Sequence, residues 1–215
     1  MPGRCYVAPP RCSDKMQLRS AALLFVLLAA FITAAQAQEK RIVLEHPLVL
    51  ADGDGKTVTS DDFPEKFLLV YFGYTHCADQ CPTALSAMVE ALAEIGPAAD
   101  YIQPLFVTVD PERDRGVALN EFTAAFDKQL VGLTGSQVQI AAAAEALGVE
   151  YRKVLAGNED YVIDHSSVLS LIGPDRRNAV TFAFAEPYLI AAKLIAELDR
   201  GGVALGKVNN LRAYR

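Results

Sequence analysis

The pattern of apolar and polar positions along the chain follows two periods. Continuous or alternating apolar runs predict strands, and apolar residues recurring every three or four positions predict helices. The predicted strands are 68–72, 105–109, 131–133, 149–155, 165–172 and 179–184. The predicted helices run from Pro82 to Gly96, through 119–126, from Ser136 to Gly148 and from Pro187 to Gly201. This order predicts one α/β domain whose central sheet is covered by helices on both faces.

Two hairpins are predicted in addition. Residues 41–58 resemble an edge hairpin that turns at Asp52-Gly53-Asp54-Gly55, since Asp-Gly steps are typical of tight turns. A calcium loop is disfavoured there because the later ligand positions and the closing glutamate are missing. The segment 173–175 joins the last two strands into a second hairpin, and 156–164 reads as a polar loop.

The N-terminal segment predicts export. Lys15 and Arg19 precede the uncharged stretch Ala21–Ala35, which is followed by the small-x-small pattern Ala35-Gln36-Ala37. These are the three parts of a secretory signal peptide, here residues 1–37. Fifteen residues fall short of the roughly 20 that span a membrane, so cleavage is favoured over an uncleaved anchor. Met16, just before the basic flank, is an alternative candidate for the true start.

The net charge of the segment after the predicted signal peptide limits the kinds of molecule that it can be expected to bind. Residues 1–37 hold four basic residues and one acidic residue, which leaves 20 − 4 = 16 basic and 26 − 1 = 25 acidic residues in 38–215. The resulting net charge of −9 argues against a nucleic-acid partner. Export would place the two cysteines of this segment in an oxidising compartment.

Cys77 and Cys81 lie between a predicted buried strand and a predicted helix. The positive end of a helix dipole favours thiolate, so Cys77 is expected to be the more reactive of the two. The three intervening residues allow a disulfide if the Cα atoms come within about 7 Å. They also offer a wide bite for a metal. A structural disulfide, a redox pair and a metal site therefore all remain open.

The positions of the three histidines help to decide between a disulfide, a redox pair and a metal site. Two thiolates are too few for a closed zinc site, but two thiolates and one imidazole suit copper. His76 adjoins Cys77 and is expected to point away, and His46 is expected at the surface. His165 follows a loop that should lie at the same end of the sheet as the cysteines. Met88 is expected in the core because its neighbours at helical spacing are aliphatic.

Three blocks of sequence carry a family resemblance. They are YFGYTHCADQCPT at 71–83, VDPERD at 109–114 and DHSS at 164–167. In order and spacing they resemble the signature blocks of the Sco (SenC) family of copper chaperones for cytochrome c oxidase assembly. The resemblance covers residues from about Leu48 to the last helix. Ala78 departs from it, since the family usually has proline there.

The resemblance implies a thioredoxin-like fold with a central mixed sheet and an added N-terminal hairpin. It implies one copper ion per chain, as Cu(I) or Cu(II), held by Cys77, Cys81 and His165. Asp110 would support these ligands from outside, although an aspartate in a turn or at a helix start is the equal alternative.

The function expected is a metallochaperone and not an enzyme. It would deliver copper to the dinuclear copper site of cytochrome c oxidase, gated by the redox state of Cys77 and Cys81. The expected partners are the copper-site subunit of the oxidase and a thiol reductant of thioredoxin type. The expected state is a monomer in the bacterial periplasm, tethered to the inner membrane if 21–35 is not cleaved.

Two enzymatic functions remain as alternatives. A thiol-disulfide oxidoreductase acting on an oxidase subunit or another exported protein would use the same cysteines without His165. A peroxide-reducing thiol enzyme is suggested by Thr75, two positions before Cys77, but the proline at the helix start and the 164–167 block fit it poorly.

Overall fold

The computed structural model describes residues 39–156 and 160–205. The chain divides into two units between Gln38 and Glu39, and every described residue belongs to the second unit. The predicted signal peptide, its cleavage position and the candidate start at Met16 lie outside the described residues. Among the described residues, no helix combines the length and the apolar character that crossing a bilayer requires.

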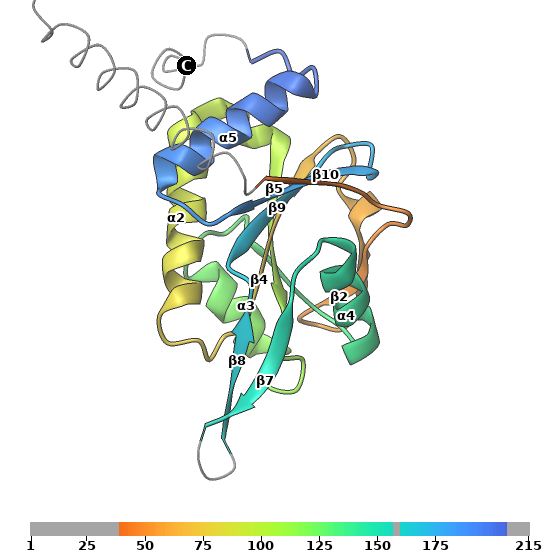
Figure 1. Cartoon of the computed structure of the whole chain (residues 1–215), viewed down its shortest axis with the longest axis vertical. Coiled ribbons are helices and arrows are strands. Elements are labelled where there is room, and N and C mark those ends of the chain that lie inside the picture. Colours follow the sequence, from red (N-terminus) through yellow and green to blue (C-terminus); the bar gives the residue numbers. More distant parts are fainter. Residues whose placement is uncertain (1–38, 157–159, 206–215) are drawn as a thin grey trace, which may run out of the picture. The chain divides into compact units, whose positions relative to one another are not determined.

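In the part of the chain that the structure describes, the main sheet has eight strands and a separate ribbon has two (Figure 1). The sheet order is β1-β10-β9-β4-β5-β6-β2-β3, and β7 pairs with β8. The strands are β1 (Lys40–Val43), β2 (Val49–Asp52), β3 (Thr57–Thr59), β4 (Phe67–Gly73), β5 (Ile102–Thr108), β6 (Val131–Thr134), β7 (Tyr151–Leu155), β8 (Tyr161–His165), β9 (Val168–Ile172) and β10 (Asn178–Ala183).

Strand β4 occupies the centre of the sheet. All seven of its residues are buried, as its uninterrupted apolar sequence predicts for a strand covered on both faces. It pairs in parallel with β5 and antiparallel with β9. The sheet is therefore mixed, which confirms the predicted α/β, thioredoxin-like fold.

Within the described residues, four α-helices cover the sheet. They are α2 (Gln80–Ile95), α3 (Val117–Ala124), α4 (Gln137–Ala146) and α5 (Pro187–Arg200), with 3-10 turns at Ser60–Asp62 and Gly96–Tyr101. Helix α5 packs against α2, and α3 lies on the same face, over Gly132 of β6. Helix α4 lies on the other face, where Thr181 of β10 donates a hydrogen bond to the Leu147 carbonyl.

The helix signals in the sequence are confirmed. Ser136 begins α4 with a capping box, in which its hydroxyl accepts from the Gln139 amide. Pro82 lies in the first turn of α2, where an amide would have no helical partner. Met88 is fully buried, as its aliphatic neighbours predicted.

The predicted hairpin over 41–58 was wrong in one respect. Strands β2 and β3 do form a hairpin around the Asp52–Gly55 turn. However, β1 pairs with β10 at the opposite edge of the sheet. Strands β1 and β2 are each only four residues long, and the choice between two edges depends on tertiary contacts that local patterns do not encode.

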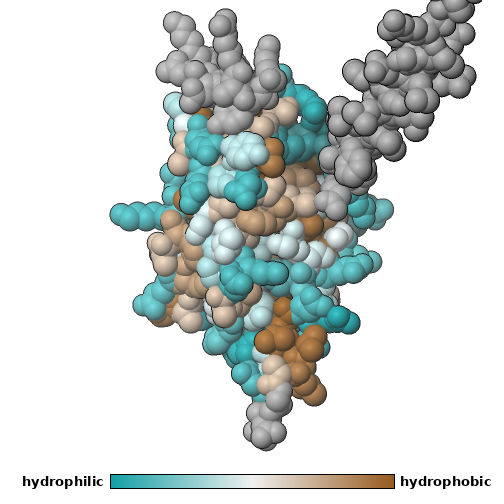
Figure 2. Space-filling view, turned by 60° about the vertical axis from the view of Figure 1, so that its left-hand side comes forward, coloured by the Kyte–Doolittle hydropathy of each residue, from teal (hydrophilic) through white to brown (hydrophobic). Residues whose placement is uncertain are grey.

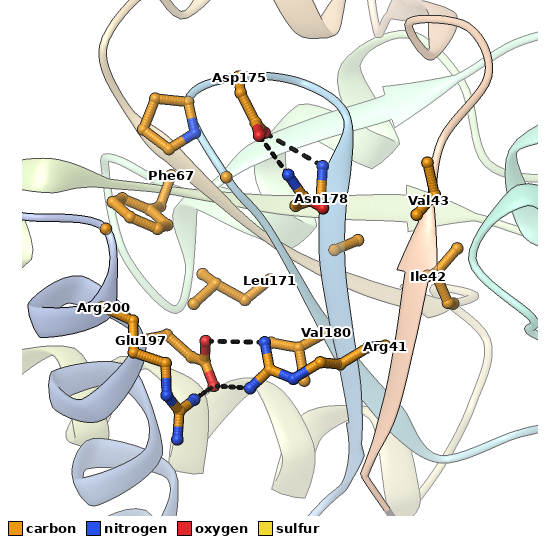
Figure 3. Close-up of a pocket in the computed structure, with 14 residues that line it drawn as sticks. Arg41, Ile42, Val43, Phe67, Leu171, Asp175, Asn178, Val180, Glu197 and Arg200 are labelled. Carbon is orange, nitrogen blue, oxygen red and sulfur yellow. Dashed lines mark hydrogen bonds and ion pairs between the residues drawn. The ribbon is translucent and has the colours of Figure 1, made fainter.

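One such contact holds β1 against α5 beside a surface hollow of about 490 Å³ (Figure 3). Arg41 of β1 and Lys193 of α5 lie 3.1 and 3.2 Å from Glu197 Oε1, and Arg200 also pairs with this carboxylate. Burial raises the pKa of Glu197, but hydrogen bonds from the three cations outweigh burial and lower it overall. The edge strand is thus tied to a helix by charge as well as by the sheet ladder.

The polar loop predicted over 156–164 was also wrong. Residues 161–165 form β8, which pairs antiparallel with β7 and projects from the main sheet (Figure 1). His165 therefore ends a strand, where the sequence predicted that it begins one. The ribbon exposes the paired Val154 and Val162, at 40% and 46%, and Leu155 at 84%. Figure 2 shows hydrophobic surface at this end of the molecule. Polar and apolar residues are both exposed on the ribbon, so the sequence pattern does not reveal the strand.

Candidate metal centre

The two cysteines lie where β4 leads into α2, with Cys77 on the connecting loop. The Cys77 amide donates to the Tyr74 carbonyl at 3.2 Å, which closes the turn. Cys77 is half-buried, whereas Cys81 lies in the first turn of α2 and is fully buried. A methyl group at Gly73 would lie 2.9 Å from Cys81 Sγ, so only glycine at the end of β4 lets this sulfur come so close.

His165 reaches the cysteines from the β7–β8 ribbon. The base of the ribbon is closed by the Ser166 amide, which donates to the Glu150 carbonyl at 2.9 Å. The imidazole lies edge-on to the rings of Tyr71 and Tyr74, each at a centroid distance of 6.1 Å. Two aromatic rings and a strand end therefore fix where the ring points.

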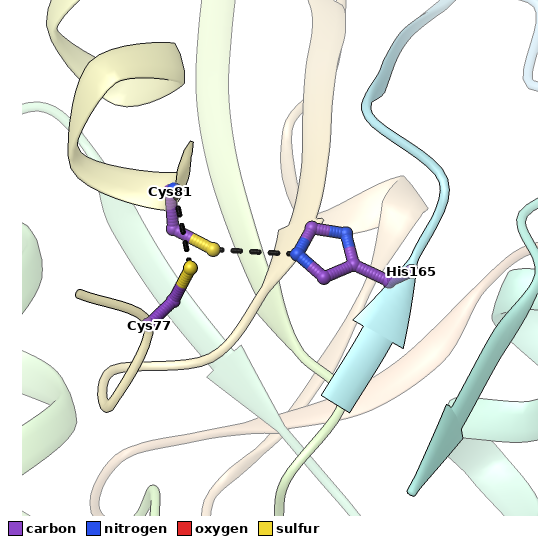
Figure 4. A group of neighbouring side chains, drawn as sticks. All are labelled: Cys77, Cys81 and His165. Carbon is purple, nitrogen blue, oxygen red and sulfur yellow. Dashed lines mark hydrogen bonds between the residues drawn. The ribbon is translucent and has the colours of Figure 1, made fainter. Parts of the chain in front are cut away.

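The side chains of Cys77, Cys81 and His165 point toward one another (Figure 4). Their ligand atoms all lie within 4.8 Å of one another, and Cys81 Sγ is 3.4 Å from His165 Nε2. Three ligands bound to one ion at about 2.0–2.3 Å in a plane would be about 3.5–4.0 Å apart. The donor set, two sulfurs and one imidazole, therefore fits a soft metal ion with little movement.

The tautomer of His165 follows from its neighbours. Nδ1 lies 3.2 Å from the Ser166 carbonyl, which can only accept, so Nδ1 carries the proton. Nε2 is then left with a lone pair directed at Cys81. Burial lowers the pKa of His165 below 6.5, against smaller opposing effects of Ser166 and Asp164. At neutral pH the ring is uncharged and able to bind a metal.

The two thiols differ in acidity. Burial raises the pKa of Cys77, but hydrogen bonds from Cys81 and from the amides of Asp79 and Gln80 outweigh it and bring the pKa below 9.0. Burial raises the pKa of Cys81 to about 12, and the neighbouring Cys77 contributes to the rise. The prediction that Cys77 is the more reactive thiol agrees with these directions. The main cause of the lowered pKa of Cys77 is hydrogen bonding from its immediate neighbours.

This asymmetry predicts selective alkylation. In the reduced protein at pH 8, iodoacetamide should modify Cys77 well before Cys81, because thiolate is the reacting form and Cys81 is buried. Mass spectrometry of peptides from timed samples measures the two rates. In urea the rates should become equal. Equal rates in the folded protein would contradict the assignment.

Asp110 lies outside the group of three ligands, and its side chain bonds to one residue of its own loop and to one residue of the ribbon. It is fully buried and accepts hydrogen bonds from Arg113 Nε and, at 2.8 Å, from the Tyr161 hydroxyl. The Arg113 guanidinium stacks 3.8 Å from the Tyr161 ring centroid, and Lys153 Nζ lies 4.4 Å from the same centroid. Asp110 thus joins the loop after β5 to the strand that carries His165.

The other two histidines lie apart from this group. His46 is exposed in the loop between β1 and β2, as expected. The side chain of His76 is 57% exposed, and its Nδ1 lies 3.6 Å from Asp114 Oδ1. The structure therefore brings together the three candidates Cys77, Cys81 and His165, and leaves these two histidines out.

Sequence reasoning missed Tyr71 and Asp114. Tyr71 reads as one more apolar residue of β4, yet its hydroxyl is buried beside the site. Asp114 reads as one of several turn aspartates, yet it is fully buried and accepts three hydrogen bonds from Thr75 and Thr108. The only sequence signal for these two residues was their position in the segments YFGY (71–74) and PERD (111–114). Those segments do not reveal which side chains the residues contact.

Comparison with known proteins gives consistent likenesses. The sequence profile described as SCO1/SenC matches residues 36–199. The Homo sapiens protein SCO1 homolog, mitochondrial, is 38% identical over 136 residues, which cover 62% of this chain and 45% of that protein. The chain therefore spans less than half the length of this curated relative.

Two solved structures are similar over most of their length. Bradyrhizobium japonicum ScoI with copper bound is 36% identical, with a TM-score of 0.63 over 72% of this chain and 98% of that one. Arabidopsis thaliana ScoI with copper bound is 32% identical, with a TM-score of 0.67 and the same two coverages.

Proposed function

Because the chain belongs to the SCO1/SenC family, we propose that it is a metallochaperone that binds one copper ion through Cys77, Cys81 and His165. The observation that carries the proposal is the convergence of these three donors within 4.8 Å. Thiolate sulfur favours Cu(I), and imidazole accepts both Cu(I) and Cu(II). Copper is cargo here, so the site must both bind and release it.

The redox state of the cysteines gates loading. Oxidation joins the two sulfurs and removes two electrons and two protons, after which neither sulfur is available as a thiolate ligand. A thiol reductant of thioredoxin type must return these electrons before copper can bind. The reduced protein is therefore the form that accepts the metal.

The recipient we propose is the dinuclear copper site of cytochrome c oxidase, on the strength of the family resemblance. Cys77 and His165 are only partly buried, so a ligand of a partner can approach the ion from their side. The site of action we propose is the bacterial periplasm, because residues 1–37 have the composition of a signal peptide. If Ala21–Ala35 is retained, the domain is tethered to the inner membrane.

Copper titration tests this function. The purified, reduced protein is titrated with Cu(I) against a chromophoric chelator, and one ion per chain should bind. The disulfide form should bind none with comparable affinity. The loaded protein is then mixed with a purified dinuclear copper domain, and copper should appear there. Equal binding by both redox forms, or no transfer, would contradict the proposal.

One observation favours a second function. The lowered pKa of Cys77 and the raised pKa of Cys81 match an attacking thiol paired with a protected one, as thiol-disulfide exchange requires. An oxidoreductase of this kind would need the sulfurs alone, so the two functions differ in their dependence on His165.

A further inference from the structure

The Tyr71 hydroxyl is a buried polar group beside the site that lacks a hydrogen-bond partner among the described residues. Tyr71 lies on β4 and is fully buried, and its Oη has no hydrogen-bond partner among the described residues. Buried hydroxyl groups in folded proteins are nearly always paired, so each exception calls for a reason. A phenylalanine would fill the same space without that cost. The hydroxyl is therefore expected to find its partner in another state of the protein.

The position of the ring indicates that partner. A methyl group at Gly73 would lie 3.2 Å from Tyr71 Cε1 and 2.9 Å from Cys81 Sγ, so the edge of the ring and the sulfur flank the same point. Cε1 adjoins the ring carbon that bears the hydroxyl, so the unpaired hydroxyl and the sulfur lie in the same buried region beside Gly73.

Cys81 changes its hydrogen-bonding character when it becomes a ligand. In the structure its thiol lies 3.4 Å from the unprotonated Nε2 of His165, to which it can donate. A metal takes cysteine as thiolate, so the thiol proton passes to solvent and the sulfur becomes a charged acceptor. A buried thiolate needs a nearby donor, and hydrogen bonds to charged groups are the strong ones. Tyr71 supplies an O–H that is already in place and unused.

We propose that Tyr71 is a positioning residue whose hydroxyl donates a hydrogen bond to Cys81 Sγ when this sulfur is bound as thiolate. The inference rests on the proposed function for the identity of the metal. It adds a fourth residue to the site, one that touches the ligand and not the ion. Such a donor stabilises the loaded form selectively, because the dithiol form does not use it.

The test compares Tyr71→Phe with Thr134→Val. Thr134 on β6 also has a buried hydroxyl with no partner in the described part of the chain, but it lies two strands away from β4, so it is a matched control. Both variants should keep the thermal stability of the parent. Tyr71→Phe should weaken Cu(I) binding about 10-fold, since a hydrogen bond to a charged group is lost. Thr134→Val should bind as the parent does.

A spectroscopic readout separates this role from a purely structural one. In the Cu(II)-loaded protein, loss of a hydrogen bond to the thiolate raises the energy of the sulfur electrons, so the sulfur-to-copper absorption band of Tyr71→Phe should move to longer wavelength. An unchanged band with unchanged affinity would overturn the inference, as would equal losses of affinity in the two variants. A parent protein that binds no copper would instead overturn the proposed function itself.

Discussion

Replacing His165 with alanine is expected to weaken copper binding by about 100-fold or more, because loss of even an outer partner of a metal ligand typically costs about 10- to 100-fold. The variant retains both sulfurs but loses the neutral Nε2 that lies 3.4 Å from Cys81 Sγ. Two thiolates alone leave the ion with an incomplete set of protein ligands. Competition titration of the reduced variant with Cu(I) measures the loss.

The chain provides its own controls for this experiment. His46→Ala and His76→Ala each remove an imidazole that lies outside the group of three ligands. His76 is the stricter control because it is adjacent to Cys77 in sequence, yet its side chain is 57% exposed. Both variants should bind copper within about twofold of the parent, as expected for surface changes.

The same variant separates the two candidate functions. Thiol-disulfide exchange requires Cys77 and Cys81 and no imidazole ligand, so His165→Ala should still cycle between dithiol and disulfide with a small thiol reductant. If the protein is a copper chaperone, His165→Ala should lose copper binding but still cycle between dithiol and disulfide. If copper affinity were unchanged in His165→Ala, the ligand set would be wrong and the oxidoreductase would become the better description.

The elements that hold the cysteines were predictable because their apolar residues follow clear patterns. Strand β4 is an unbroken apolar run, and α2 follows with apolar residues at helical spacing behind Pro82. A buried strand leading directly into a helix places the intervening loop at one end of the sheet, whatever the rest of the chain does. The location of Cys77 and Cys81 therefore followed from local patterns.

The ribbon that holds His165 was not predictable in the same way. Its strands stand off the main sheet, and Val154, Val162 and Leu155 are all substantially exposed, so the apolar residues of the ribbon do not mark its covered face. On that face, Ile163 of β8 is buried. What stabilises it is the contact of Tyr161 with Asp110 and Arg113, which are some fifty positions earlier in the chain. A contact of that range leaves no periodic trace in the sequence, and the expected meeting of His165 with the cysteines depended on the order of elements and on the family resemblance.

Asp114→Ala is expected to lower both the stability of the domain and its affinity for copper. The carboxylate is fully buried and accepts from the Thr75 amide at 2.7 Å, the Thr75 hydroxyl at 2.5 Å and the Thr108 hydroxyl at 2.7 Å. These bonds fasten the loop that carries Cys77 to the end of β5. Alanine leaves three donors without an acceptor, and each such loss costs about 1–3 kcal/mol.

We therefore expect the free energy of unfolding to fall by about 3 kcal/mol or more, which for a domain of this size lowers the melting temperature by about 6–12 °C. Thermal unfolding followed by circular dichroism measures it. Asp54→Ala, which removes an exposed carboxylate in the β2–β3 turn, should melt with the parent. Thr108→Val, which removes one of the three donors, should lose less than Asp114→Ala. A loss no greater than that of Asp54→Ala would mean that the loop is held by its own turn, through the Cys77 amide and the Tyr74 carbonyl, and not by Asp114.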